Sequence, residues 1–598
     1  MAYATCHPSP VSRLPSPVTC HLSPVTRSCG TLATMKHSGK LSGFFQSEAA
    51  IRGLQLITGL VAIALVFWPL QFATRSICCG DADGYYHIMW SHLLWEGIRA
   101  GHLPTFIWLP LTTLNPRDYV DHHFLFHVFQ IPFTWFRDLR TGAKAASLIF
   151  AILAVFSCYW LLVRYRIRFV FVWLTALLAC SAPFLYRLNM GKAPPFAIIY
   201  LIFGIYLLFQ KKYWLLLPLA FVFTLTYDMF VLLIAAALIW TAVIGWTERR
   251  FEWRPLALVL LGTAAGFVIN PYFPHNFVLF YEHLKMKVTV AGFSTKVGQE
   301  WNPYDSWEFL GNSAVACVAM LAGYVAFDPS DRKRSHYSLF FLIFSTLLLL
   351  MTARWRRIAE YWPPFAVIFA AFSLQPWLAG TRSSLTQLSR DMLAELQPFL
   401  DRDEQTGSAG ISQRRELLQI GAAAVIAVVL GLALSANLRV TYSDIQNNER
   451  PDFFKGGMQW VRANVPAGEI VFNTDWDDFP RMFYFDPTHR YVSGLDPTYL
   501  YDRNTELSHL YDRITLGQEK DPAQLIRERF GARYVFTDND DDHADFYAEA
   551  MDSGWFEVVY EDKDCTILHI RDQKVEPPVD KTDENKDDTS GEENDNGG

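Results

Sequence analysis

The sequence predicts a mainly α, polytopic membrane helical bundle with a small soluble α/β domain near the C-terminus. Hydrophobic residues make up 51% of the 598 residues and aromatic residues 15%. Apolar runs separated by short charged turns recur from about residue 54 to about residue 436, and the first, at residues 54–72, has about the length needed to cross a bilayer. After residue 440 the chain becomes more charged and carries short strand-like segments.

We predict about eleven membrane spans from these runs, within a range of about 11–13. The run at residues 214–246 is broken only by Thr226-Tyr227-Asp228. A single helix of that length would measure about 50 Å, which exceeds a bilayer, so we predict a hairpin. The predicted spans lie near residues 54–72, 145–163, 169–186, 195–209, 214–227, 229–246, 255–272, 313–327, 338–353, 361–379 and 416–436.

Basic residues in the turns predict the orientation of these spans. With the hairpin in place, most Lys and Arg residues of the short turns fall on one side, which the positive-inside rule makes cytoplasmic. The N-terminus is then cytoplasmic, and both the first long loop and the C-terminal domain are extracytoplasmic. The basic turns are at Arg164–Arg168, Lys211-Lys212, Arg249–Arg254, Arg332–Arg334 and Arg414-Arg415.

Four regions follow from the composition. Residues 1–45 are rich in Pro, Ser, Thr and His, and we interpret them as a disordered or non-native extension, with translation expected to start at Met35. Residues 46–439 form the membrane domain, with a large external loop at 75–144. Residues 440–572 form the soluble domain, and 573–598 an acidic disordered tail. The net charge of −7 and the absence of a basic patch argue against a nucleic-acid partner.

The first loop opens with Asp81-Ala82-Asp83-Gly84-Tyr85-Tyr86-His87. Two carboxylates this close can share a hard cation such as Mg²⁺ or Mn²⁺, which also binds phosphate oxygens. The competing interpretation is a solvated acidic turn that caps the next helix.

A second polar group in this loop is Asp121-His122-His123, followed by His127. His123 and His127 are four residues apart and would share a helical face, which suits a transition metal better than Mg²⁺. Alternatively, these histidines form hydrogen bonds at the membrane interface and bind nothing.

The turn Arg354-Trp355-Arg356-Arg357 carries three arginines on the predicted outer side, against the general charge bias. Guanidinium groups bind phosphate oxygens in a bidentate manner, so an anionic ligand explains their position. Binding to lipid headgroups is the alternative.

These features together resemble the catalytic subunits of oligosaccharyltransferases and, more broadly, the GT-C class of membrane glycosyltransferases. In that family the Asp of the first loop binds the metal and orients the acceptor, a role that the resemblance assigns to Asp83, with Asp81 as its neighbour. Val297-Gly298-Gln299-Glu300 is similar to an external-loop motif whose Glu, here Glu300, contacts the acceptor. The family's arginine for the donor pyrophosphate corresponds to Arg357, with Arg354 as the second choice.

Two departures from the family pattern are visible. Its Trp-Trp-Asp-Tyr-Gly signature, which reads the acceptor peptide, is matched only at Trp476-Asp477. Its acidic pair between the third and fourth spans is absent, and the turn contains Lys192 instead. Lys192 would supply positive charge for the donor phosphate in place of a metal bridge, or His123 and His127 would complete the metal site.

The resemblance implies an enzyme that moves a sugar or oligosaccharide from a polyprenyl phosphate or pyrophosphate carrier to a protein or glycan acceptor, with Mg²⁺ or Mn²⁺ as the cofactor. Asp83 and Glu300 would be catalytic. One alternative is a GT-C enzyme that adds single sugars to a lipid-linked or surface glycan. The other is a membrane transporter or scaffold without enzymatic activity.

Overall fold

The computed structural model describes residues 48–79, 82–288, 301–329, 336–378, 408–539 and 541–575. The predicted N-terminal extension 1–45, the candidate residues Asp81 and Glu300, and the tail from residue 576 onward lie outside the described residues. The chain divides into a unit of residues 1–54 and a unit of residues 55–598. The contacts given below all lie within the second unit.

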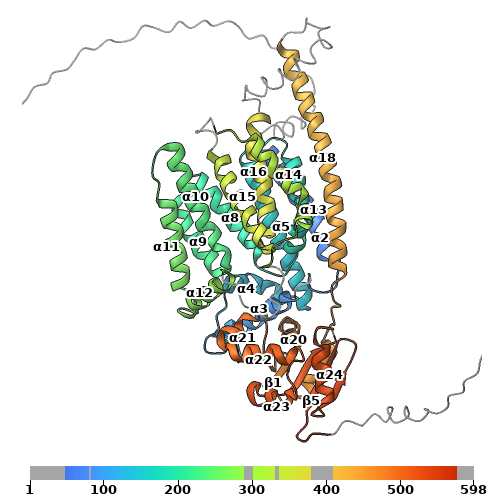
Figure 1. The fold of residues 1–598 in the computed structure, drawn as a ribbon. Helices are drawn as coiled ribbons and strands as arrows, with labels where there is room; N and C mark the ends of the chain where they lie inside the picture. The colour runs from blue at the N-terminus through green and yellow to red at the C-terminus, as the bar shows by residue number, and fades with distance from the viewer. Residues whose placement is uncertain are drawn as a thin grey trace, which may run out of the picture. The chain divides into compact units, whose positions relative to one another are not determined.

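Helices dominate this unit, and every predicted span contains at least one (Figure 1). By length and composition, five described helices can cross a membrane alone, and two bent pairs raise that number to seven. The remaining predicted spans are shorter apolar helices. The helices found in the predicted spans, long and short together, are α2 (Glu48–Gln71), α5 (Leu139–Arg164), α6 (Val170–Ala179), α7 (Ala182–Leu188), α8 (Pro194–Phe209), α9 (Leu216–Thr226), α10 (Val231–Glu248), α11 (Arg254–Val268), α14 (Ala314–Ala326), α15 (His336–Arg354), α16 (Trp362–Leu378) and α18 (Ser408–Gln446).

The predicted hairpin at residues 214–246 is confirmed. Tyr227 adopts an extended backbone that ends α9, and the short η3 (Asp228–Phe230) leads into α10. Figure 1 shows α9, α10 and α11 side by side, and α9 packs along α11. This break places Asp228 at the end of the helices rather than in their middle.

The first loop is largely helical. It contains α3 (Asp83–Ala100), α4 (Phe124–Gln130) and η1 (Ile131–Trp135). Asp83 opens α3, where a negative side chain suits the helix dipole, and Gly101 ends it in the left-handed conformation. The buried face of α3 packs against α5 and against α20 (Phe479–Phe485) of the C-terminal part.

The C-terminal part contains a five-stranded sheet with the order β2-β1-β3-β5-β4. β1 (Ile470–Asn473) runs parallel to β2 (Arg490–Tyr491) and β3 (Ala532–Asp538), while β5 (Cys565–Ile570) is antiparallel to β3 and β4 (Phe556–Glu561). Four of the strands match the short strand-like segments of the sequence after residue 440, which lie at 470–472, 534–536, 556–560 and 565–570. The last two of these segments form the pair β4 and β5. β2 was not predicted because two residues are too few to show a strand pattern.

Aromatic residues of the first loop and of the C-terminal part share one buried core. Phe106 stacks on Tyr119 with ring centres 4.5 Å apart, and Trp108 packs against Phe483 at 4.8 Å. The Trp108 indole nitrogen donates to the carbonyl of Pro487 at 2.7 Å. These contacts confirm that the motif loop and the C-terminal part lie at the same side of the helices.

Helix α18 continues beyond the predicted domain boundary at residue 440 as far as Gln446. Ile445 is fully buried in the core of the helical bundle, and the Thr441 hydroxyl donates to the carbonyl of Ala182 at 3.4 Å. The helix is therefore extended by packing against α7.

Candidate functional site

A cavity lies between the first loop, the turn before α8, the break between α9 and η3, and the C-terminal part. It encloses about 830 Å³ of space not occupied by atoms, including space open to solvent. Its polar lining comes from segments far apart in the sequence, among them Asp83, His87, His123, Lys192, Asp228 and Arg357. Four of these six residues were candidates from the sequence.

Asp83 and Lys192 form an ion pair on the wall of this cavity. The Lys192 ammonium lies 2.9 Å from Oδ2 of Asp83, and the two side chains are 12% and 29% exposed respectively. Two glycines allow the turn of Lys192 to approach the start of α3, because a Cβ on Gly191 would lie only 3.0 Å from the Cα of Gly84. The pair therefore depends on a close backbone approach.

Arg357 reaches the cavity from η5 (Arg356–Glu360). Its Nη2 donates to the Tyr227 hydroxyl at 2.9 Å, and its guanidinium carbon lies 5.3 Å from the ring centre of Trp301. Arg354 is the last residue of α15 and does not line the cavity; its guanidinium lies over the Trp355 ring at 6.0 Å. Of the two arginine candidates for phosphate binding, only Arg357 lines the cavity together with Asp83.

A buried chain of hydrogen bonds ends at His87 on the cavity wall. The Trp90 indole donates to Asp121 at 3.0 Å, Nδ1 of His127 contacts the Asp121 carboxylate at 2.8 Å, and Nε2 of His127 lies 2.8 Å from Nδ1 of His87. Burial and the His127 imidazole lower the pKa of His87 well below its usual value. If both imidazoles are uncharged, His127 donates to Asp121, His87 donates to His127, and Nε2 of His87 keeps its lone pair.

His123 lies near His87 but makes different contacts. Its ring is stacked on Tyr227, with centres 5.3 Å apart, and it adjoins His122 at 4.0 Å. Burial and the neighbouring His122 imidazole lower the pKa of His123 well below its usual value. The cavity therefore contains neutral imidazoles beside the Lys192 and Arg357 cations.

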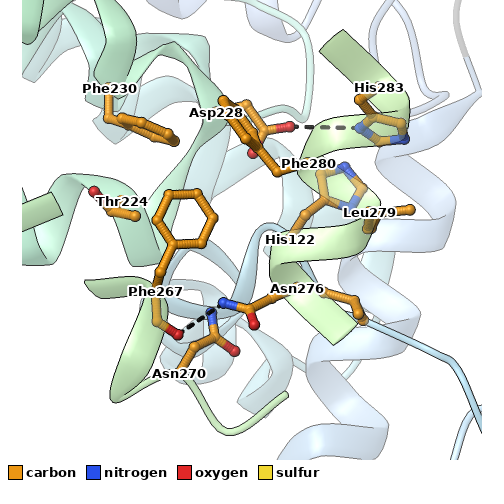
Figure 2. Close-up of a pocket in the computed structure, with 11 residues that line it drawn as sticks. His122, Thr224, Asp228, Phe230, Phe267, Asn270, Asn276, Leu279, Phe280 and His283 are labelled. Carbon is orange, nitrogen blue, oxygen red and sulfur yellow. Dashed lines mark hydrogen bonds and ion pairs between the residues drawn. The ribbon is translucent and has the colours of Figure 1, made fainter. Parts of the chain in front are cut away.

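A second cavity adjoins the first and shares His122, Asp228 and His283 with it. Figure 2 shows Asp228 facing His283, with 3.8 Å between the carboxylate and Nδ1, and Asn276 donating to the carbonyl of Phe267 at 2.9 Å. Its empty volume is about 350 Å³. The polar lining of the site therefore continues behind Asp228 toward α12 (His275–Val288).

Comparison with solved structures identifies the fold. The oligosaccharyltransferase of Archaeoglobus fulgidus in its apo form aligns with a TM-score of 0.58 at 12% identity, covering 84% of this chain and 73% of that chain. ArnT from Cupriavidus metallidurans, bound to undecaprenyl phosphate, aligns with a TM-score of 0.52 at 14% identity, covering 86% of this chain and 97% of that chain. This chain has a GT-C fold.

A third structure with this GT-C fold is AglB from A. fulgidus in complex with an inhibitory peptide and a dolichol phosphate. It aligns with a TM-score of 0.53 at 11% identity, covering 84% of this chain and 72% of that chain. No protein-family model and no curated protein sequence matches the chain. The predicted resemblance is thus confirmed at the level of the fold, and with it a multi-pass membrane architecture.

The remaining predicted site residues lie elsewhere on the GT-C fold. Trp476 and Asp477 follow β1, where Trp476 is half-buried and Asp477 exposed, and they do not line the cavity. Within the described residues, Asp83, Lys192, Arg357 and His123 meet at one cavity, whereas Arg354, Trp476 and Asp477 lie apart from it.

The Mg²⁺ or Mn²⁺ ion expected at Asp83 stays a prediction, because its second expected carboxylate, Asp81, lies outside the described residues. The Asp83 carboxylate is already paired with the Lys192 ammonium. Both ring nitrogens of His127 have hydrogen-bonding partners, so this side chain offers no lone pair to a metal. Asp121 and His87 orient His127 in this arrangement, and its role as a metal ligand stays a prediction.

Sequence reasoning missed His87, Asp228 and His283 as lining residues. His87 stands at the end of the first-loop motif, which is a usable signal, and Asp228 stands at the break in an apolar run. His283 carries no local signal, because only the packing of α12 brings it next to Asp228.

Proposed function

We propose that this protein is a membrane glycosyltransferase that transfers a sugar or oligosaccharide from a polyprenyl phosphate or pyrophosphate donor to an acceptor outside the cytoplasm. The observation that carries the proposal is the cavity in which Asp83, Lys192 and Arg357 meet. The solved structures with this fold include one with dolichol phosphate and one with undecaprenyl phosphate, which supports a polyprenyl carrier.

The transfer breaks the bond between the anomeric carbon and a phosphate oxygen, and the electron pair leaves with the phosphate. Lys192 and Arg357 stabilise that charge, as preorganised cations in a partly buried site. Asp83 positions the acceptor, and Glu300 is proposed to assist from outside the described residues. The acceptor's oxygen or nitrogen then bonds to the anomeric carbon, and His87 is the candidate acceptor of its proton.

The orientation is part of the same proposal. The basic turns face the cytoplasm together with the N-terminus, and the cavity and the C-terminal part face outward. A lipid-linked donor suits such a location, because its lipid places the sugar at the outer leaflet. The reaction there then needs no soluble nucleotide sugar.

The acceptor is either a protein or a glycan. Two observations favour a glycan acceptor and the transfer of a single sugar: Trp476-Asp477 lies outside the cavity, and the alignment with ArnT covers 97% of that chain. Membranes that contain the protein and its lipid donor can be supplied with a labelled Asn-X-Ser/Thr peptide. Labelled glycopeptide would identify a protein acceptor, and its absence with continued glycan extension would identify the alternative.

The central test is Asp83→Asn. We expect transfer to fall by about two to four orders of magnitude, because the amide can neither pair with Lys192 nor hold the acceptor in the same way. Asp118→Asn, in the same loop but outside the cavity, is the matched control. Normal transfer by a correctly folded Asp83→Asn protein would refute the assignment.

The donor site is tested by Arg357→Ala. Loss of a charge-assisted hydrogen bond is worth about 1.5–3 kcal/mol, so we expect the KM for the lipid donor to rise about 10-fold to 100-fold. Arg354→Ala serves as the control, because this neighbouring arginine does not line the cavity. Equal effects of both substitutions on the donor KM would contradict a specific role for Arg357.

A further inference from the structure

A group of acidic residues and one histidine lies in the C-terminal part, apart from the cavity described above. Asp475 follows β1, Asp538 ends β3, and His543 ends the short helix η8 (Asp541–His543). One potential ligand atom from each of these three side chains lies within 4.8 Å of the other two. In the described part of the chain, this is the one group of three such side chains that meets this spacing.

The fold places this group where α/β sheets commonly bind ligands. β1 and β3 are parallel neighbours in the sheet, so their carboxyl ends lie at the same edge. Asn473, the last residue of β1, holds the following segment through a hydrogen bond from its Nδ2 to the carbonyl of Asp475 at 2.6 Å. The carboxylates are therefore presented by rigid strand ends.

His543 has the orientation of a metal-binding histidine. Its Nδ1 lies 3.0 Å from the carbonyl of Thr515, to which only an N–H can donate. In the uncharged imidazole this leaves the lone pair on Nε2, the typical arrangement when a carbonyl orients a ligating histidine. The residue is only 7% exposed, and Nε2 has no hydrogen-bonding partner; it faces Oδ2 of Asp475 at 3.5 Å.

A further buried acidic residue lies beside this group. Asp478 is 8% exposed, and its Oδ2 has no hydrogen-bonding partner. Burial, followed by the charges of Asp538 and Asp475, raises the pKa of Asp478 well above its usual value. The nearby Arg481 offsets part of this repulsion but is paired with Glu449. Asp478 therefore adds a third acidic side chain next to Asp475 and Asp538.

We infer that Asp475, Asp538 and His543 bind a divalent metal ion, with Asp478 as a further carboxylate beside it. Two carboxylates and one imidazole suit Mn²⁺ or Zn²⁺ better than Ca²⁺ or Mg²⁺, which prefer oxygen ligands alone. Ligand atoms about 2.1 Å from a metal lie up to about 4.2 Å apart, so the observed spacing needs only a small contraction. The ion would tie the end of β1 to the end of β3.

The test is a Mn²⁺ titration of the purified full-length protein in detergent, after treatment with a chelator and its removal. Electron paramagnetic resonance of free Mn²⁺ gives the number bound per chain, and thermal unfolding gives the effect on stability. We expect one ion that Zn²⁺ displaces and that raises the melting temperature. His543→Gln should weaken binding at least 10-fold and remove the stabilisation by Mn²⁺.

Two controls make the result specific. Asp541→Asn changes an exposed acidic residue of the same helix and should bind Mn²⁺ like the natural protein. Asp83→Asn should also keep this ion, which separates the site from the cavity. If His543→Gln does not fold, Asp538→Asn replaces it as the decisive variant.

The inference is overturned if the natural protein binds no Mn²⁺ or Zn²⁺ at millimolar concentration, because His543 would then act as the protonated partner of Asp475. It is also overturned if the folded His543→Gln or Asp538→Asn protein binds Mn²⁺ as tightly as the natural protein. Neither outcome depends on glycosyl transfer.

Discussion

At the scale of single residues, the cavity owes its chemistry to partners buried behind it. Asp121 and His127 do not line the cavity. They form a chain of hydrogen bonds that orients His87, which does line it. Burial alone would raise the pKa of Asp121, but the His127 imidazole and the Trp90 indole outweigh this and lower it. An ionised Asp121 favours a proton on Nδ1 of His127.

We predict that His127→Gln slows transfer about 10-fold to 100-fold, through the loss of His87 orientation. A proton acceptor works in its neutral form, so the rate should fall as pH decreases through the pKa of His87, which is lowered in the folded protein. Since His127 is one of the groups that lower this pKa, its replacement should move the acid limb of the pH–rate profile to higher pH.

The control for this variant is His92→Gln, on the same helix α3. The pH dependence of kcat/KM should be the same in the His92→Gln variant as in the natural protein. An unshifted acid limb in His127→Gln would mean that this residue has only a structural role.

At the scale of the elements, the site depends on how closely the start of α3 meets the turn before α8. Gly84 and Gly191 meet with no side chains between them, and each neighbours a member of the Asp83–Lys192 pair. The sequence shows both glycines, but their contact arises from the packing of α3, α5 and α8.

We predict that Gly191→Ala lowers the melting temperature and weakens transfer. The new Cβ would meet the Gly84 backbone at 3.0 Å, and overpacking of this kind costs about 1–3 kcal/mol. Separation of Lys192 from Asp83 should reduce kcat/KM about 10-fold, measured with donor and acceptor at low concentration.

Gly245→Ala in α10 is the matched substitution, since its Cβ would meet no atom within 4 Å. It should leave transfer unchanged. Similar behaviour of the two variants would contradict the proposed close contact.

At the scale of the whole unit of residues 55–598, the first loop and the C-terminal part act as one body. Trp108 is 6% exposed between them, and its carbonyl accepts a hydrogen bond from the backbone N–H of Tyr491 at 2.8 Å. Tyr499 of the C-terminal part lines the same cavity as Asp83. Docking of the two regions therefore completes the site.

We predict that Trp108→Ala destabilises this docking by about 3–5 kcal/mol, the usual cost of removing a large buried aromatic side chain. Limited proteolysis should then cleave the first loop faster, and transfer should fall with it. Trp307→Ala, whose side chain is 81% exposed, should change neither. Unchanged proteolysis of the Trp108 variant would show that the loop docks without it.

Particular residues show which features of the structure can be predicted from the sequence. The apolar runs predict the helices because each must be long and hydrophobic in its own right, and the break at Tyr227-Asp228 predicts the hairpin for the same local reason. Asp83, Lys192 and Arg357 are identifiable as candidates from residue type and position. The bend of 81° between α6 and α7 was not predicted, because apolar composition continues through it. The bend of 86° between α13 (Ser306–Asn312) and α14 lies at the start of the span predicted at 313–327, and the helix before it was not predicted.

The sequence by itself determined the fold class, the approximate positions of the spans and most of the C-terminal strands, since these follow from hydrophobicity and periodicity along neighbouring residues. Only the tertiary structure decided that Lys192 pairs with Asp83, that Arg357 rather than Arg354 lines their cavity, and that His127 is held by Asp121 and His87. The physical reason is that, apart from the contact between Asp121 and His127, these contacts join segments separated by tens to hundreds of residues, and only the packing of the helices brings them within hydrogen-bonding distance.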